Sequence, residues 1–183
     1  MKRKLHLLAG MMIVGSCLLA SSALRAQSPQ KMDPAKVLDH LLGNYEHEMV
    51  PLAEAMPADK YNFAPINGEF KGVRTFAEQV KHIAGANYFY FGSIANTKPA
   101  MPKMADLKTK DQIVQALKNS FAYGHQVIAT ITPENAFDTI GSEGNARTRA
   151  GTAAAAVAHG FDHYGQLVEY LRMNGIVPPA SRH

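Results

Sequence analysis

Apolar residues recur every three or four positions along four segments of the chain, a spacing that places them on one face of an α-helix. The segments span about 33–56, 75–96, 109–131 and 148–174. No segment shows sustained alternation of apolar and polar residues, so strands are not expected. Four amphipathic helices with mostly short connections predict an all-α fold, a four-helix bundle.

Start and stop signals mark the same helices. Asp33-Pro34 reads as an N-cap followed by proline at the first helical position. Residues 75–78 and 109–112 each have the sequence of a capping box, in which two side chains satisfy backbone N–H groups at a helix start. Gly175 suits the end of the last helix, because glycine readily adopts the left-handed conformation found there.

The first 26 residues have the pattern of a secretory signal peptide. A cationic start precedes an apolar stretch from Leu7 to Ala20, and Ala23 and Ala26 are candidate cleavage positions. A membrane anchor is one alternative, but the stretch is short for a bilayer span. A lipoprotein is another, because Cys17 ends a loose lipobox. We expect residues 1–26 to be a signal peptide, residues 27–183 to be one bundle domain, and the protein to be periplasmic or extracellular.

Removing the signal peptide changes the charge balance. Four of the 19 basic residues lie in it and none of the 15 acidic ones, which leaves 15 of each sign. A net charge of zero gives no basis for a nucleic-acid or anionic membrane partner. Cys17 is the only cysteine, so the domain itself has no thiol to form a disulfide, attack a substrate or bind a metal ion.

Any metal ion must therefore be bound by histidine, aspartate, glutamate or backbone oxygen. His159 and His163 are four residues apart, so on a helix their imidazoles lie on the same side, about one turn apart. His163 falls in a stripe that includes Ala156 and Gly160, whose small size would let another helix approach closely. A metal ion would satisfy both imidazoles, and two ordinary core histidines are the alternative.

A third ligand should come from a facing helix, and His82 is the best candidate. Taken alone, it is more simply a histidine that is hydrogen-bonded to a backbone carbonyl. His40 and His47 lie opposite the apolar face of their helix and are expected in solvent, and His125 lies at the edge of the core face. No glutamate follows His159, so the H-E-x-x-H arrangement of zinc peptidases is absent.

Residues 75–84 and 159–167 resemble the DinB/YfiT-like family, most specifically in the H-x3-H spacing followed by Gly165-Gln166-Leu167. The resemblance covers nearly all of residues 27–183. It implies a four-helix bundle with a three-histidine site, and the matching residues here are His82, His159 and His163. It further implies a divalent metal ion, zinc or nickel, and frequent homodimers.

Three functions stay open at this point. Characterised members of the family include thiol-dependent transferases and isomerases, which favours a metal-dependent enzyme, a hydrolase or transferase, acting on an unknown small molecule. The alternatives are a metal-binding or small-ligand-binding bundle without catalysis, and a structural dimer with a vestigial site. No general base is identified, since helix capping explains Glu78 equally well and Asp162 is expected on the far side of its helix from His163.

The last predicted helix carries a second set of apolar residues, roughly opposite the first. This set predicts burial against another helix or against a partner subunit. Its members are Val157, Phe161, Tyr164 and Val168.

Overall fold

The computed structural model describes residues 31–142 and 144–182, and residues 32–183 form one compact unit. The expected signal peptide, with its alternatives of an anchor and a lipoprotein at Cys17, lies outside the described residues. Within the described part, no helix is long and apolar enough to cross a bilayer.

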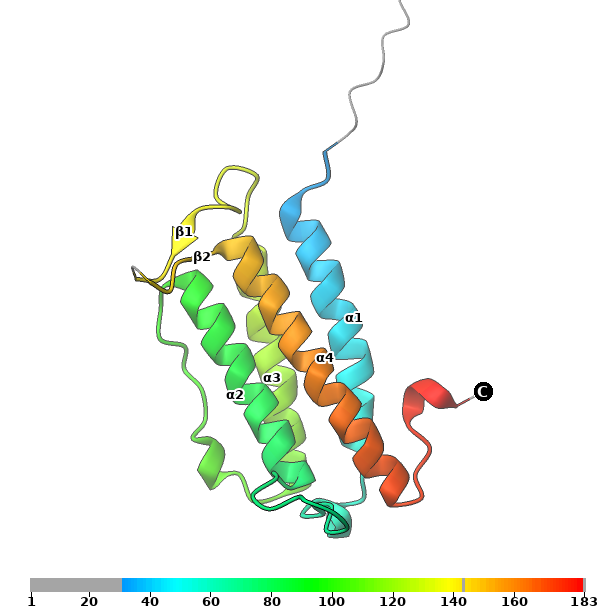
Figure 1. Ribbon diagram of the computed structural model, residues 1–183. Coiled ribbons are helices and arrows are strands. Elements are labelled where there is room, and N and C mark those ends of the chain that lie inside the picture. The colour runs from blue at the N-terminus through cyan, green and yellow to red at the C-terminus, as the bar shows by residue number, and fades with distance from the viewer. Residues whose placement is uncertain (1–30, 143, 183) are drawn as a thin grey trace, which may run out of the picture. The chain divides into compact units, whose positions relative to one another are not determined.

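The four predicted helices are present and lie side by side (Figure 1). Their bounds are α1 Pro34–Ala55, α2 Phe76–Ala95, α3 Lys110–Ile128 and α4 Arg149–Met173. Helices α1 and α2 each pack against both α3 and α4. The prediction of a four-helix bundle is therefore confirmed for this part of the chain.

Side chains cap the helix starts as their sequences predicted. The Asp33 carboxylate accepts a hydrogen bond from the Ala35 N–H at 2.9 Å. Both capping boxes form, one closed by Glu78 at the start of α2 and the other by Gln112 at the start of α3. At the start of α4, the Thr148 hydroxyl accepts from the Gly151 N–H at 3.0 Å.

The connections contain short elements that the sequence did not reveal. The 3-10 helices η1 Ala58–Lys60 and η2 Met104–Asp106 lie in connections, and η3 Pro179–Ser181 follows α4. Strand β1 Thr139–Ile140 pairs antiparallel with β2 Arg147–Thr148, so the expectation of no strands is wrong. Two residues per strand are too few to produce a recognisable alternation of apolar and polar positions.

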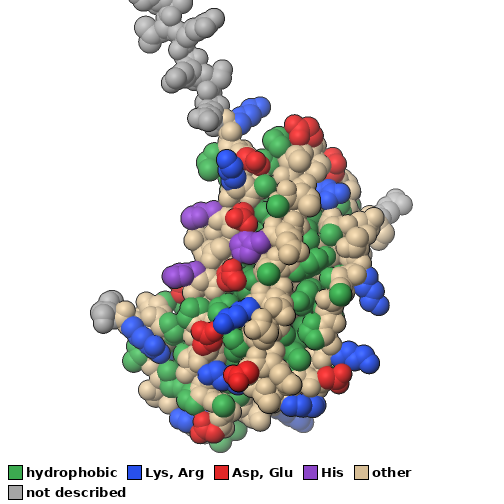
Figure 2. All heavy atoms as spheres, turned by 180° about the vertical axis from the view of Figure 1, so that it is seen from behind, with side chains coloured by type: hydrophobic (Ala, Val, Ile, Leu, Met, Phe, Trp, Pro, Cys, Tyr) green, Lys and Arg blue, Asp and Glu red, His purple; other side chains and the backbone are tan. Residues whose placement is uncertain are grey.

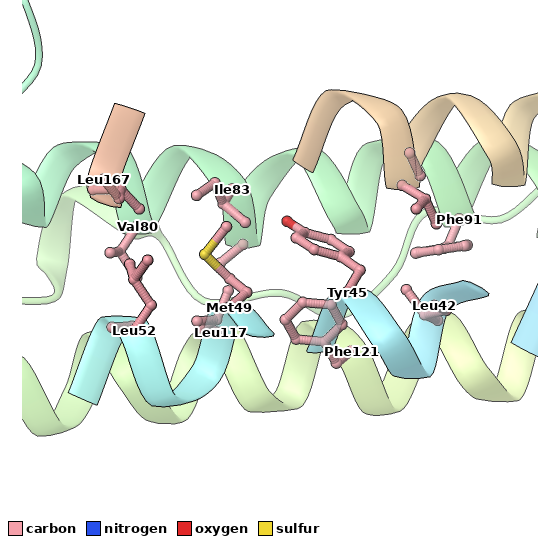
Figure 3. Packing of buried hydrophobic residues seen from close by; sticks show 14 of the residues in the cluster. Leu42, Tyr45, Met49, Leu52, Val80, Ile83, Phe91, Leu117, Phe121 and Leu167 are labelled. Carbon is pink, nitrogen blue, oxygen red and sulfur yellow. The ribbon is translucent and has the colours of Figure 1, made fainter. Parts of the chain in front are cut away.

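The core lies between the helices and is built from their predicted apolar faces. In Figure 3, side chains of α1, α2 and α3 point toward one another around the ring of Tyr45. The fully buried members at its centre include Leu42, Met49, Leu52, Phe76, Ile83, Phe91, Ile94, Leu117 and Phe121. Acidic and basic side chains are interspersed on the outer face shown in Figure 2.

Helix α4 approaches α1 closely at Gly160, where the Tyr45 ring occupies the space that a Cβ atom would take. Ala153 and Ala156, on the same stripe of α4, are also buried. The close approach predicted from these small residues is thus confirmed. The Tyr45 hydroxyl is buried without a hydrogen-bond partner among the described residues, and burial raises its pKa.

The second apolar set of α4 also lies against α1. The Phe161 ring is 5.5 Å from the Tyr45 ring, and the Tyr164 hydroxyl donates to Glu48 Oε2 at 2.9 Å. Helix α1 therefore contacts Phe161 and Tyr164 of this set, while the Phe161 side chain remains 41% exposed.

Gly160→Ala should destabilise the protein by about 1–3 kcal/mol, because the added methyl group overlaps the Tyr45 ring and forces the two helices apart. Gly165→Ala is the matched control on the same helix, since Gly165 is exposed and nothing lies within 4 Å of the place that a Cβ atom would take. The control should be neutral or gain about 0.5–1 kcal/mol from helix propensity. Equal unfolding free energies for both variants in urea titrations would contradict the close packing.

Candidate metal centre

Helices α2 and α4 bring three imidazoles together at the place predicted for the metal ion. His159 Nε2 lies 3.0 Å from His163 Nε2 and 3.3 Å from His82 Nε2. One ligand atom from each of the three residues lies within 4.8 Å of the other two. Two nitrogens bound to a tetrahedral zinc ion at about 2.0–2.1 Å are about 3.3 Å apart, so the observed spacing fits such an ion.

The hydrogen-bonding capacity of the imidazoles also fits a cation. A neutral imidazole has one N–H donor and one nitrogen lone pair. His159 Nε2 is the common neighbour of both other rings, and its single lone pair cannot accept a full hydrogen bond from each. A divalent ion would engage the lone pairs of all three nitrogens at once. The residues present are thus compatible with a divalent metal ion.

The surroundings of His82 and His159 keep both imidazoles neutral. Burial, followed by the positive charge of Arg74 and the neighbouring imidazoles, lowers the pKa of His82 to about 4. Burial and the neighbouring His163 also lower the pKa of His159, against a smaller opposing effect of Asp162. Both side chains therefore have a free lone pair at neutral pH, which is the form that binds a metal ion.

Two glutamines that the sequence analysis did not single out lie against His163. The Gln79 side-chain amide is 2.6 Å from His163 Nδ1, and Gln166 Oε1 is 3.3 Å from the same atom. Gln79 is only 3% exposed, and its amide also donates to Gln166 Oε1. Their spacing from the histidines could have indicated these contacts. Gln79 is three residues before His82 and Gln166 is three residues after His163, and residues so spaced lie on the same face of a helix.

The carboxylate of Asp162 lies nearer the site than its place on the helix predicted. Asp162 Oδ2 is 3.9 Å from His163 Nδ1 and accepts a hydrogen bond from Gln166 Nε2 at 3.1 Å. Spacing along a helix predicts only the positions of the Cα and Cβ atoms. The position of the carboxylate depends in addition on the side-chain torsion angles. Gln166 therefore connects Asp162 to the buried imidazole.

Glu78 serves as a helix cap. Its Oε2 accepts from the Thr75 N–H at 2.8 Å, and this hydrogen bond is the first cause of its lowered pKa. Among the described residues, no fourth histidine, cysteine or carboxylate joins the three-histidine cluster. A metal ion bound there would have fewer than four ligands from the described part of the chain.

A pocket of about 730 Å³ opens beside the cluster. His82 and His159 line it, while His163 is buried behind them. The rest of the lining is mostly apolar and comes from α2 and from the segment before α3. These residues are Glu78, Lys81, Gly85, Ala86, Phe89, Tyr90, Met101, Met104 and Ala105.

The other described histidines, His40, His47 and His125, do not belong to this cluster. His40 and His47 are exposed on α1. His125 on α3 is partly buried, with Nδ1 2.6 Å from Asp39 and Nε2 3.1 Å from Glu46. Burial alone would lower its pKa, but these two acidic partners outweigh burial and raise it. His125 thus links α3 to α1.

The fold and the site define a helical bundle with an interhelical cluster of three histidines. Residues 41–167 match the family model of the DinB superfamily, and the chain belongs to this superfamily. The family resemblance of the two histidine-bearing segments is thereby confirmed. A comparison with curated proteins finds no match.

Solved structures show the same fold. A DinB-like protein from Bacillus subtilis superposes with a TM-score of 0.61 at 20% identity, over 76% of this chain and 92% of that one. A conserved protein from Enterococcus faecalis gives the same TM-score at 15% identity, over 78% of this chain and 97% of its own. At these identities the likeness concerns the fold alone.

Gln166→Leu should weaken zinc binding by about 10–100-fold, because the His163 ring would lose one of the two side chains that contact its Nδ1 and orient it. Gln115→Leu is the matched control, since Gln115 is exposed on α3 and its amide bonds only to Asn119. Competition titrations with a chelator measure both affinities. The same affinity for both variants would show that Gln166 does not orient the imidazole.

Proposed function

We propose that this chain is an exported, divalent-metal-binding DinB protein that acts as a metal-dependent enzyme of the hydrolase or transferase type. Zinc or nickel, bound by His82, His159 and His163, is the proposed ion. The observation that carries the proposal is the convergence of these three imidazoles at one end of an open pocket, without a fourth protein ligand among the described residues.

The number of ligands separates a reactive site from a structural one. Structural zinc sites have four protein ligands, whereas catalytic sites have three and leave a position for water or substrate. The nearest candidate for a fourth ligand was Glu78, and its carboxylate is held by the Thr75 N–H. The exposed side of His82 and His159 faces the pocket, so a substrate can reach that position from solvent.

Each residue of the centre has a defined task in this proposal. The three Nε2 atoms hold the ion, and the side chains of Gln79 and Gln166, which contact His163 Nδ1, orient that ring. The apolar lining of the pocket binds and orients the substrate and limits the water around it. A divalent ion bound there supplies Lewis-acid chemistry, by polarising a substrate group and making its proton more acidic.

A binding protein without catalysis is the second candidate, and one observation favours it. The only carboxylate that lines the pocket among the described residues belongs to Glu78, which is engaged in the helix cap. The pocket therefore offers no free carboxylate as a general base. A bundle that binds a metal ion together with a small ligand would have the same geometry.

Export is proposed from the pattern of the first 26 residues. Production of the full chain in a Gram-negative host, followed by N-terminal sequencing of the periplasmic fraction, tests it. The protein should be recovered there and begin near Gln27. An uncleaved chain in the cytoplasm would contradict export.

His163→Ala should lose bound metal, because it removes the buried ligand that lies 3.0 Å from His159 Nε2. Elemental analysis of the purified wild type should find about one zinc or nickel ion per chain, and zinc in excess should raise its melting temperature. His125→Ala is the control, since His125 pairs with acidic residues elsewhere, and it should keep the ion. A wild type without metal and without a zinc-dependent shift would end the proposal.

A further inference from the structure

The pocket beside the histidines follows one face of α2. On α2 its lining extends from Glu78 past His82 and Gly85 to Phe89 and Tyr90, and Met101 and Met104 also belong to it. A Cβ atom at Gly85 would lie 3.9 Å from Met104 Cγ, so α2 and Met104 lie close together there. At about 1.5 Å of helix per residue, the lining extends about 10 Å from His82 to Phe89.

The far end of this pocket is apolar and uncovered. The Phe89 side chain is 66% exposed and that of Met101 is 49% exposed, although both are large apolar residues. Contiguous apolar surface in a concave site favours a ligand that removes it from water. The size and lining of the far end therefore suit a hydrocarbon chain or ring.

The histidine end has the opposite character once an ion is bound. Three neutral imidazoles do not cancel any of the charge of a divalent cation. A zinc ion held by three neutral imidazoles takes a carboxylate oxygen as a further ligand, and the Glu78 carboxylate in the lining is held by the Thr75 N–H. An anionic group is therefore the complementary partner at this end.

We propose that the pocket binds an amphipathic carboxylate, with its carboxylate at the three histidines and its apolar body between α2 and Met104. This assignment rests on the proposed metal site, because the ion supplies most of the positive charge. A single negative charge suits the pocket better than a phosphate, since Lys81, the one basic residue in the lining, already donates to the Leu107 carbonyl at 3.2 Å.

A chain-length series tests the two ends of the ligand separately. Acetate, butanoate, hexanoate and octanoate are titrated into the purified, zinc-loaded protein by calorimetry, with octylamine and 1-octanol as probes that change only the head group. Affinity should rise by about fourfold for each methylene that is buried, until the chain passes Phe89. Octylamine and 1-octanol should bind at least about tenfold more weakly than octanoate.

Gly85→Leu places a side chain in the pocket beside Met104, one helical turn from His82, so zinc content is measured in the same samples. It should weaken octanoate binding by about tenfold or more, while the affinity for acetate and the zinc content stay unchanged. Gly165→Leu is the matched control, because it makes the same helical substitution at an exposed site where nothing lies within 4 Å of an added Cβ atom. This variant should bind octanoate as the wild type does.

The outcomes separate this inference from the function on which it rests. Zinc at about one ion per chain, with octanoate no tighter than acetate or unaffected by Gly85→Leu, overturns the carboxylate pocket and leaves the metal site intact. Equal binding of 1-octanol and octanoate overturns the anionic head group. A protein that binds no zinc overturns the metal site itself, and the carboxylate assignment with it.

Discussion

The close approach of α4 to its neighbours is the constraint on which both the fold and the site depend. Gly160 lies between His159 and His163 in sequence, and the Tyr45 ring of α1 occupies the space beside it. Because the histidines flank this contact on the same helix, a larger residue at position 160 would displace the backbone that carries them. The separation of 3.3 Å between the imidazole nitrogens of His82 on α2 and His159 on α4 tolerates little movement of that kind.

The second determinant is the hydrogen-bonding capacity of the buried side chains. His163 is buried, and two glutamines contact its Nδ1 from α2 and α4, one of which is linked to Asp162. On the opposite side of the His163 ring, its Nε2 atom and that of His82 both lie next to His159 Nε2. The single lone pair of His159 Nε2 cannot accept a hydrogen bond from both. The outer nitrogen of His163 thus has hydrogen-bond partners, whereas the three Nε2 atoms lack a partner that engages all of them. A cation between them would be such a partner.

The sequence predicted the helices and part of the site, and the reasons differ. Apolar periodicity and capping signals act within a few residues, so α1 to α4 and their starts were predictable. The pairing of His159 with His163 follows from helical spacing in the same way. His82 joined them mainly through family resemblance, because no local rule specifies which residues on two distant helices meet. The roles of Gln79 and Asp162 depend on side-chain torsions and tertiary packing, and the hairpin β1–β2 is too short to leave a periodic signal.

In the proposed function, three imidazoles bind the ion beside the pocket, without a fourth histidine, cysteine or carboxylate ligand among the described residues. X-ray absorption at the metal edge of the zinc-loaded or nickel-loaded protein tests this claim most directly, because it reports the ligands of the ion. The account predicts three histidine nitrogens at about 2.0–2.1 Å for zinc, with the remaining coordination supplied by an exchangeable light atom. A spectrum that requires a fourth protein ligand, or fewer than three histidines, would contradict it.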